Sequence, residues 1–64
     1  MIIRGLIMNN YSITFVPRDG SHIWGYGDYV TGYRNAVACA RKYCEDFFAK
    51  TGNRIDYYLD KLVF

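Results

Sequence analysis

The residue types used in catalysis are few and scattered in this chain. Around the single histidine, His22, lie groups that could serve as nucleophile or orienting acid: Ser21, Asp19, Asp28 and, further along, Cys39. A hydrolytic site needs a nucleophile, a base and an orienting group that the surrounding structure holds together. The spacing indicates no such assembly, so we interpret His22 as a loop histidine beside a turn.

Asp56 and Asp60 are the other candidates for acid–base chemistry. They stand four residues apart in a segment with strand-like alternation, which separates them by about 13 Å along a strand. This distance is too long for two carboxyl groups to act jointly on one bond. We therefore expect no enzymatic activity and assign no catalytic residue.

Metal and phosphate sites are also disfavoured. Cys39 and Cys44 are the only cysteines, and in one helix they project roughly 140° apart, too far for a disulfide. One histidine and no C-x-x-C pair make no zinc set. Gly25, Gly27 and Gly32 fit neither the dinucleotide-binding nor the Walker spacing. We expect no metal and no cofactor, and we interpret both cysteines as small, buried or half-buried apolar residues of a reducing compartment.

Aromatic side chains instead indicate a binding surface. Residues 22–33 contain the only tryptophan and three of the seven tyrosines, among three glycines. Trp, Tyr and Arg are the residue types that dominate binding energies. We assign Tyr33 and Tyr57 to the core. The predicted partner-binding residues are Trp24, Tyr26, Tyr29, Tyr58 and, at the tip of a hairpin, Arg18.

Two strands are predicted in the first half of the chain. Residues 11–16 alternate with period two and place Tyr11, Ile13 and Phe15 on one face. Residues 17–21 hold a proline and an Asp-Gly pair, which are typical of a hairpin loop. Residues 22–26 then return as a second strand, which we expect Gly25 and Gly27 to end.

A helix and a third strand are predicted in the second half. The helix begins near Thr31 as N-cap and ends near Thr51, followed by a Gly-Asn C-cap signal. Its apolar stripe consists of Tyr33, Val37, Ala40, Cys44, Phe47 and Phe48, with Ala36 and Tyr43 on the flanks. Its opposite face carries three i,i+4 pairs of opposite charge: Arg41–Glu45, Lys42–Asp46 and Asp46–Lys50. Residues 54–64 alternate as a strand, with a bulge or change of environment near residues 60–61.

These elements predict one α+β domain over residues 1–64, of order β-β-α-β. The simplest assembly is a three-stranded, mainly antiparallel sheet with the helix packed on one face. The core would contain the helix stripe, Ile13, Phe15, Ile55, Tyr57 and Leu59. If Ile23 faces this core, the other sheet face exposes Trp24, Tyr26 and Tyr58. Residues 1–8 form either an extension or a short extra strand.

Size and charge narrow the function further. A chain of 64 residues builds only a small core, and its net charge of +2 does not by itself indicate nucleic acid. The apolar N-terminus is too short for a transmembrane helix and lacks a signal-peptide cleavage site. We therefore expect a soluble cytoplasmic protein without a membrane partner.

The segment Gly32-Tyr33-Arg34-Asn35-Ala36-Val37-Ala38-Cys39-Ala40-Arg41-Lys42-Tyr43 and the hairpin–helix–strand layout resemble small proteins of bacteriophages and mobile elements. In size and layout the chain is similar to anti-CRISPR proteins. The likeness covers most of the chain as architecture but includes no diagnostic motif, so it transfers no site residues. It implies a non-enzymatic inhibitor that covers a surface of a host protein or ribonucleoprotein complex in the bacterial cytoplasm. Because the chain is not acidic, it departs from DNA-mimicking members, and a direct protein-surface blocker is the compatible subtype.

Two other hypotheses use the same surface. Single-stranded nucleic acid could stack its bases on the aromatic rings, with phosphates bound by Arg18, Arg34 and Arg54. Against this, the basic residues are interleaved with acidic ones. Alternatively, the open face or a sheet edge could pair with a second copy, so both a monomer and a homodimer remain compatible with the sequence.

Overall fold

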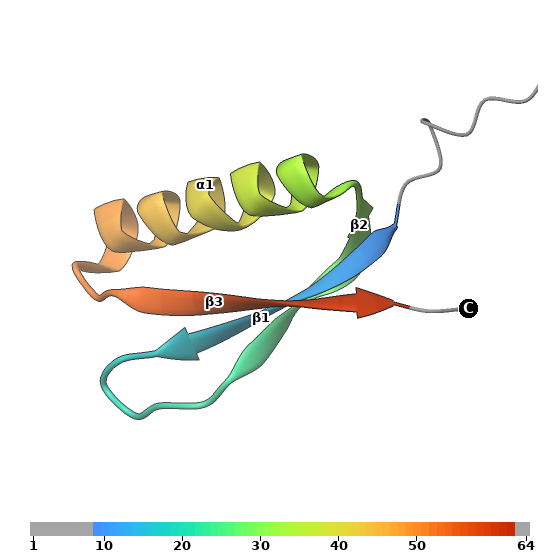
Figure 1. Cartoon of the computed structure of the whole chain (residues 1–64). Coiled ribbons are helices and arrows are strands. Elements are labelled where there is room, and N and C mark those ends of the chain that lie inside the picture. The colour runs from blue at the N-terminus through green and yellow to red at the C-terminus, as the bar shows by residue number, and fades with distance from the viewer. Residues whose placement is uncertain (1–8, 63–64) are drawn as a thin grey trace, which may run out of the picture.

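The computed structural model describes residues 9–62, which form three strands and one helix. The strands are β1 (Asn10–Pro17), β2 (Trp24–Thr31) and β3 (Ile55–Leu62), and the helix is α1 (Tyr33–Thr51). They form an antiparallel sheet of order β2-β1-β3, with α1 lying across one face (Figure 1). The predicted α+β fold is confirmed. The extension or strand predicted for residues 1–8 lies outside the described residues.

β1 and β3 pair as their alternation predicts. Ile13 lies opposite Leu59, and Phe15 lies opposite Tyr57. These side chains face α1, where Ile13 and Phe15 are fully buried and Tyr57 and Leu59 pack against them. The pairing continues without interruption to Leu62, so the bulge, one of the two explanations offered for residues 60–61, is absent from this part of β3, and the change of environment stays a prediction.

β2 is longer than predicted and contains the irregularity of the sheet. The strand continues through both of its glycines to Thr31. Ser12 pairs with Tyr29 and Thr14 with Gly25, so residues 26–28 of β2 lie opposite a single residue of β1. Gly27 adopts a φ of 70° in this bulge, a value that glycine reaches without steric strain. The strand therefore bulges where we expected it to end.

The ends of α1 are set by two glycines. Gly32 is the N-cap, whereas the predicted cap Thr31 donates its hydroxyl hydrogen to Asn10 Oδ1 instead. The predicted N-cap is therefore wrong, because that hydroxyl joins β2 to β1. At the other end Gly52 adopts a left-handed φ of 76°, and its N–H donates to Phe48 O. The predicted C-cap is confirmed.

The buried stripe of α1 is rotated relative to the predicted one. Ala36 and Ala40 are fully buried against the sheet, because their small side chains let the helix backbone approach closely. Tyr43 stacks on Phe15 with ring centroids 4.2 Å apart. The assignment of Tyr33 to the core is wrong, since the side chain is 61% exposed at the first turn.

The solvent-facing charges of α1 pair less than their spacing predicts. Lys42 Nζ lies 3.7 Å from Asp46 Oδ2. The ion pairs within residues 9–62 are this one and Arg18–Asp56. The predicted pairs Arg41–Glu45 and Asp46–Lys50 are therefore not formed.

Candidate functional site

The single tryptophan lies on the helix side of the sheet. Trp24 pairs with Phe15, and its ring centroid lies 6.0 Å from that of Phe15 and 5.4 Å from that of Phe47. Its Nε1 donates a hydrogen bond of 2.9 Å to the hydroxyl oxygen of Tyr43. The predicted open-face position of Trp24 is wrong because pairing with Phe15 directs its ring toward α1. Ile23, which we expected to face inward, precedes β2 and is 62% exposed.

Tyr26 lies at the rim of the same helix-side cluster. Its ring meets Phe15 and Tyr43 edge-on, with centroids 6.4 and 6.2 Å away. Side-chain hydrogen bonding with Cys39 is the main cause that raises the pKa of Tyr26. The predicted open-face position is wrong for this residue too. Gly25 pairs with Thr14 and therefore lies on the open face, so the next residue, Tyr26, projects to the helix side.

Arg18 is held by an acidic side chain instead of projecting from the hairpin tip. Its guanidinium donates to both carboxylate oxygens of Asp56, with Nη2 2.8 Å from Oδ1 and Nε 3.2 Å from Oδ2. The hydrogen bonds from Arg18 are the main cause that lowers the pKa of Asp56, and the carboxylate in turn raises the pKa of Arg18. The Arg18 side chain stays 60% exposed in this pair, so its role in partner binding stays a prediction.

The structure brings Tyr29 and Tyr58 to the open face of the sheet. Tyr29 lies opposite Ser12 on one side of β1, and Tyr58 lies opposite Thr14 on the other. Their exposed fractions are 52% and 60%. Within residues 9–62, no element covers this face (Figure 1). Of the predicted aromatic set, these two tyrosines flank the small polar side chains of the central strand.

A hollow with a volume of about 500 Å³ opens beside the bulge. Its lining includes Gly25 and Gly27 of β2, Ser12 and Thr14 of β1, and Tyr29. Because the two glycines carry no side chain, nothing fills the space above the backbone here, and the sheet surface is hollow at this point. The glycines that we expected to end β2 therefore shape its open face, a feature that the sequence pattern did not indicate.

Most of the charged side chains near the open face are acidic, and Arg18 is held there by Asp56. Asp60 lies opposite Ser12, Asp56 lies opposite Val16, and Asp28 lines the hollow. The arginine and lysine residues of α1 lie on the other layer: Arg34, Arg41, Lys42 and Lys50. Since Arg18 is paired with Asp56, this face combines exposed tyrosines with an excess of carboxylates.

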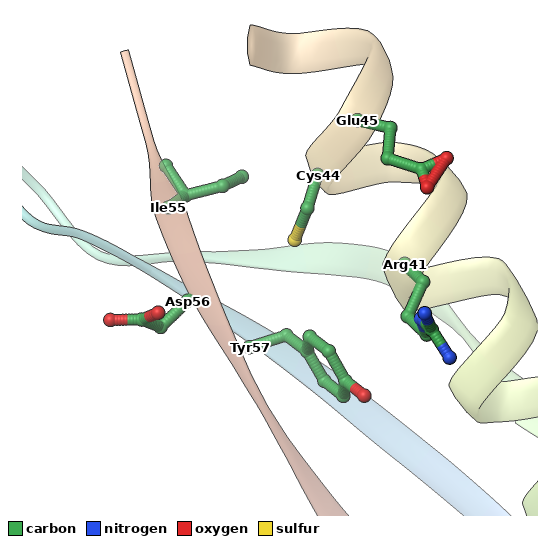
Figure 2. A pocket seen from close by; sticks show the side chains of 6 residues that line it. All are labelled: Arg41, Cys44, Glu45, Ile55, Asp56 and Tyr57. Atoms are coloured by element: carbon green, nitrogen blue, oxygen red, sulfur yellow. The ribbon is translucent and has the colours of Figure 1, made fainter.

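A second concave region lies between α1 and β3. This groove has a volume of about 280 Å³ and is lined by Arg41, Cys44, Glu45, Ile55, Asp56 and Tyr57. Figure 2 shows the Cys44 thiol pointing between Ile55 and Tyr57, while Asp56 points away from the helix. Burial is the main cause that raises the pKa of the Cys44 thiol, so the thiol lines the groove in its protonated form at neutral pH.

No protein-family model, curated protein or solved structure matches this chain. No helix within residues 9–62 is long and apolar enough to span a membrane. The same residues contain no group of His, Cys, Asp and Glu side chains arranged to hold a metal ion. The arrangement of the described side chains is thus the basis for a functional proposal.

Proposed function

We propose that this chain is a non-enzymatic binding protein that attaches to a basic surface of another protein through the open face of its sheet. The observation that carries the proposal is the exposure of Tyr58 and Tyr29, 60% and 52%, on a face that also holds Asp60 and borders Asp28. Tyrosines supply large contact area at low cost in side-chain entropy. Surrounding carboxylates select partners rich in Lys and Arg.

The finer proposal is a phage-type inhibitor that acts as anti-CRISPR proteins do, by covering a surface of a host ribonucleoprotein complex in the bacterial cytoplasm. Surfaces that bind nucleic acid are basic because they neutralise phosphates. An open face with exposed tyrosines and carboxylates is complementary to such a surface. The small size of the chain supports the same role, since an inhibitor that only covers a site needs no catalytic pocket.

Single-stranded nucleic acid is the weaker candidate. Its phosphates would need cations beside the exposed tyrosines. Arg18 is engaged by Asp56, Arg34 lies on α1, and the Arg54 guanidinium lies 4.4 Å from the centroid of the Phe48 ring. The charge of Arg18 is thus paired, Arg34 lies on the other layer, and Arg54 contacts an aromatic ring of α1.

The test compares two tyrosines of equal exposure on opposite layers. Tyr58→Ser removes an open-face ring, and Tyr33→Ser removes a ring that is 61% exposed on α1. Immobilised wild-type protein and both variants are incubated with lysate of a bacterial host that carries CRISPR immunity, and bound proteins are quantified by mass spectrometry. We expect a stoichiometric host protein that Tyr58→Ser loses by about tenfold or more and Tyr33→Ser retains.

Two further measurements complete the test. Expression of the wild type in that host should raise the plaque count of a targeted phage, and Tyr58→Ser should abolish the increase. If every captured protein is bound equally by wild type and Tyr58→Ser, the open face is not the binding surface. Salt-sensitive binding of single-stranded DNA or RNA that requires Tyr58 would favour the nucleic-acid hypothesis instead.

A further inference from the structure

The two edges of the sheet differ in regularity. The β2 edge is interrupted by the bulge around Gly27. β3, by contrast, pairs with β1 in unbroken register over all eight of its residues. Within residues 9–62, no strand lies on the outer side of β3. A regular edge of this length presents a row of backbone donors and acceptors that another strand can pair with.

The direction of the backbone groups at this edge follows from one backbone hydrogen bond at the end of the β1–β3 pair. Arg18 N–H donates to Arg54 O at 3.2 Å, and the β1–β3 register continues from this pair. Hydrogen-bonding residues alternate along an antiparallel pair, so Asp56, Tyr58 and Asp60 direct their N–H and C=O groups to β1. The residues that direct theirs outward, with side chains on the helix side, are Ile55, Tyr57, Leu59 and Lys61.

The groove of Figure 2 runs along this edge and carries a self-complementary pair of charges. Arg41 and Glu45 stand one turn apart on α1, and both line the groove beside the stretch of β3 from Ile55 to Tyr57. Neither forms an ion pair within residues 9–62. A two-fold axis through Tyr57, perpendicular to the sheet, would place the two helices antiparallel. Each Arg41 would then face Glu45 of the other copy, as an isologous contact requires.

The charges of β3 favour the same position of the two-fold axis, with Tyr57 at the centre of the paired strands. When Tyr57 pairs with Tyr57 of a second copy, Ile55 lies opposite Leu59 and Asp56 lies opposite Tyr58. A centre at residue 56 would place Asp56 opposite Asp56, and a centre at residue 58 would place Asp56 opposite Asp60. Like charges directly opposite each other destabilise an antiparallel pair, so pairing centred on Tyr57 is preferred to both neighbouring centres.

We propose that a second copy of this chain pairs antiparallel with the outer edge of β3, centred on Tyr57, and joins two three-stranded sheets into one. The two grooves then meet at the dimer axis and bury Tyr57, Ile55 and Leu59 more deeply. This inference goes beyond the proposed function, because it uses the edge of the sheet and leaves the open face with Tyr29 accessible.

Charge reversal on the helix tests the pairing without touching the core. Sedimentation equilibrium over about 1–500 μM should show a reversible dimer of the wild type. Arg41→Glu would place a glutamate against Glu45 of the other copy in both of the contacts that the two-fold axis relates. This repulsion should raise the dimer dissociation constant by about tenfold. The double variant Arg41→Glu/Glu45→Arg restores opposite charges between copies and should return the constant to the wild-type value.

Lys42→Glu is the matched control for the same change in net charge. Lys42 lines a hollow with Tyr26 on the β2 side of α1, away from the proposed axis, so its reversal should leave the dissociation constant unchanged. Tyr29→Ser should also leave it unchanged, and this separates the inference from the open-face function. A wild type that stays monomeric over the whole range would overturn the proposal and leave the edge to an extended segment of a different protein. A dimer with equal affinity in Arg41→Glu would equally overturn it.

Discussion

At the scale of single residues, Trp24 is a packing residue that closes the space between β2 and α1. Its ring contacts Phe15 and Phe47, and its Nε1 hydrogen bond ends on Tyr43. Replacement by alanine removes these contacts and leaves a cavity between β2 and α1. We predict that Trp24→Ala lowers the free energy of unfolding by about 2–4 kcal/mol, measured by urea denaturation with far-UV circular dichroism.

Trp24→Phe separates the two contributions of this side chain. Phenylalanine keeps a ring against Phe15 but leaves the Tyr43 hydroxyl without its donor, so we expect a smaller loss of about 1 kcal/mol. Should Trp24→Ala cost less than about 0.5 kcal/mol, as surface substitutions do, Trp24 would not be part of the core.

The Arg18–Asp56 pair gives the fold a defined response to acid. Asp56 has a lowered pKa in the folded chain because Arg18 bonds its carboxylate. Its stabilising effect is therefore present above the unfolded pKa of about 3.9 and is lost as pH falls through the lower folded value. We predict that an NMR titration of the side-chain carboxyl carbon places the Asp56 pKa below its ordinary range, and that Arg18→Gln raises it toward that range.

Arg34→Gln is the control, because it removes the same charge from α1 without touching Asp56. It should leave the Asp56 titration where it is in the wild type. An equal rise in both variants would mean that the net charge of the molecule, and not the hydrogen-bonded pair, sets this pKa.

At the scale of elements, two glycines with different backbone angles test how α1 ends and how β2 is shaped. Gly52 has a φ of +76°, and an added Cβ would meet nothing within 4 Å, so alanine is resisted by the backbone alone. Gly25 lies outside the positive-φ region, and an added Cβ would lie 3.8 Å from Ile13 O, an ordinary contact. We predict that Gly52→Ala lowers the free energy of unfolding by about 1 kcal/mol.

Gly25→Ala should instead be neutral or stabilising by up to about 1 kcal/mol, because alanine restricts the unfolded chain. Thermal unfolding of the two variants beside the wild type gives the comparison. Equal destabilisation by both substitutions would contradict the roles assigned here to the C-cap and the bulged strand.

The elements that local pattern determines were predictable. β1 and β3 follow from alternation around Ile13, Phe15 and Ile55, and the end of α1 follows from Gly52. β2 could not be predicted in the same way, because its bulge at Gly27 depends on pairing with β1, which is not local in sequence. One shift in phase moves every side chain of a strand to the other face.

The same argument explains the mixed result for the candidate site. Alternation alone allowed either Ile23 or Trp24 to face inward, and only the pairing of Trp24 with Phe15 decides between them. Beyond the bulge the phase changes, so Tyr29 reaches the open face although Tyr26 does not. The partner-binding roles of Tyr29 and Tyr58 stay predictions, and the groove beside Cys44 had no signal in the sequence beyond the spacing of Arg41 and Glu45.

At the scale of the whole molecule, the small core makes the sheet edges important for stability. The fully buried side chains of the core cluster are few, and the largest are Phe15 and Ile13. A domain of this size has only a few kcal/mol of net stability. β1 lies between two strands, whereas β3 has one partner within residues 9–62. Pairing with a second copy would give β3 the protection that β1 already has.

Amide hydrogen exchange followed by NMR distinguishes the monomer from this dimer residue by residue. In dilute protein we predict alternating protection along β3. Asp56, Tyr58 and Asp60 should exchange slowly because their N–H groups point to β1, and Tyr57 and Leu59 should exchange faster because theirs point outward. Raising the protein concentration above the dimer dissociation constant should slow the exchange of the Tyr57 and Leu59 amides by about tenfold or more. The exchange rates of the β2 amides should not change. Uniform protection of β3 at every concentration would contradict the open edge, and loss of the concentration effect in Arg41→Glu would link it to the helix pair.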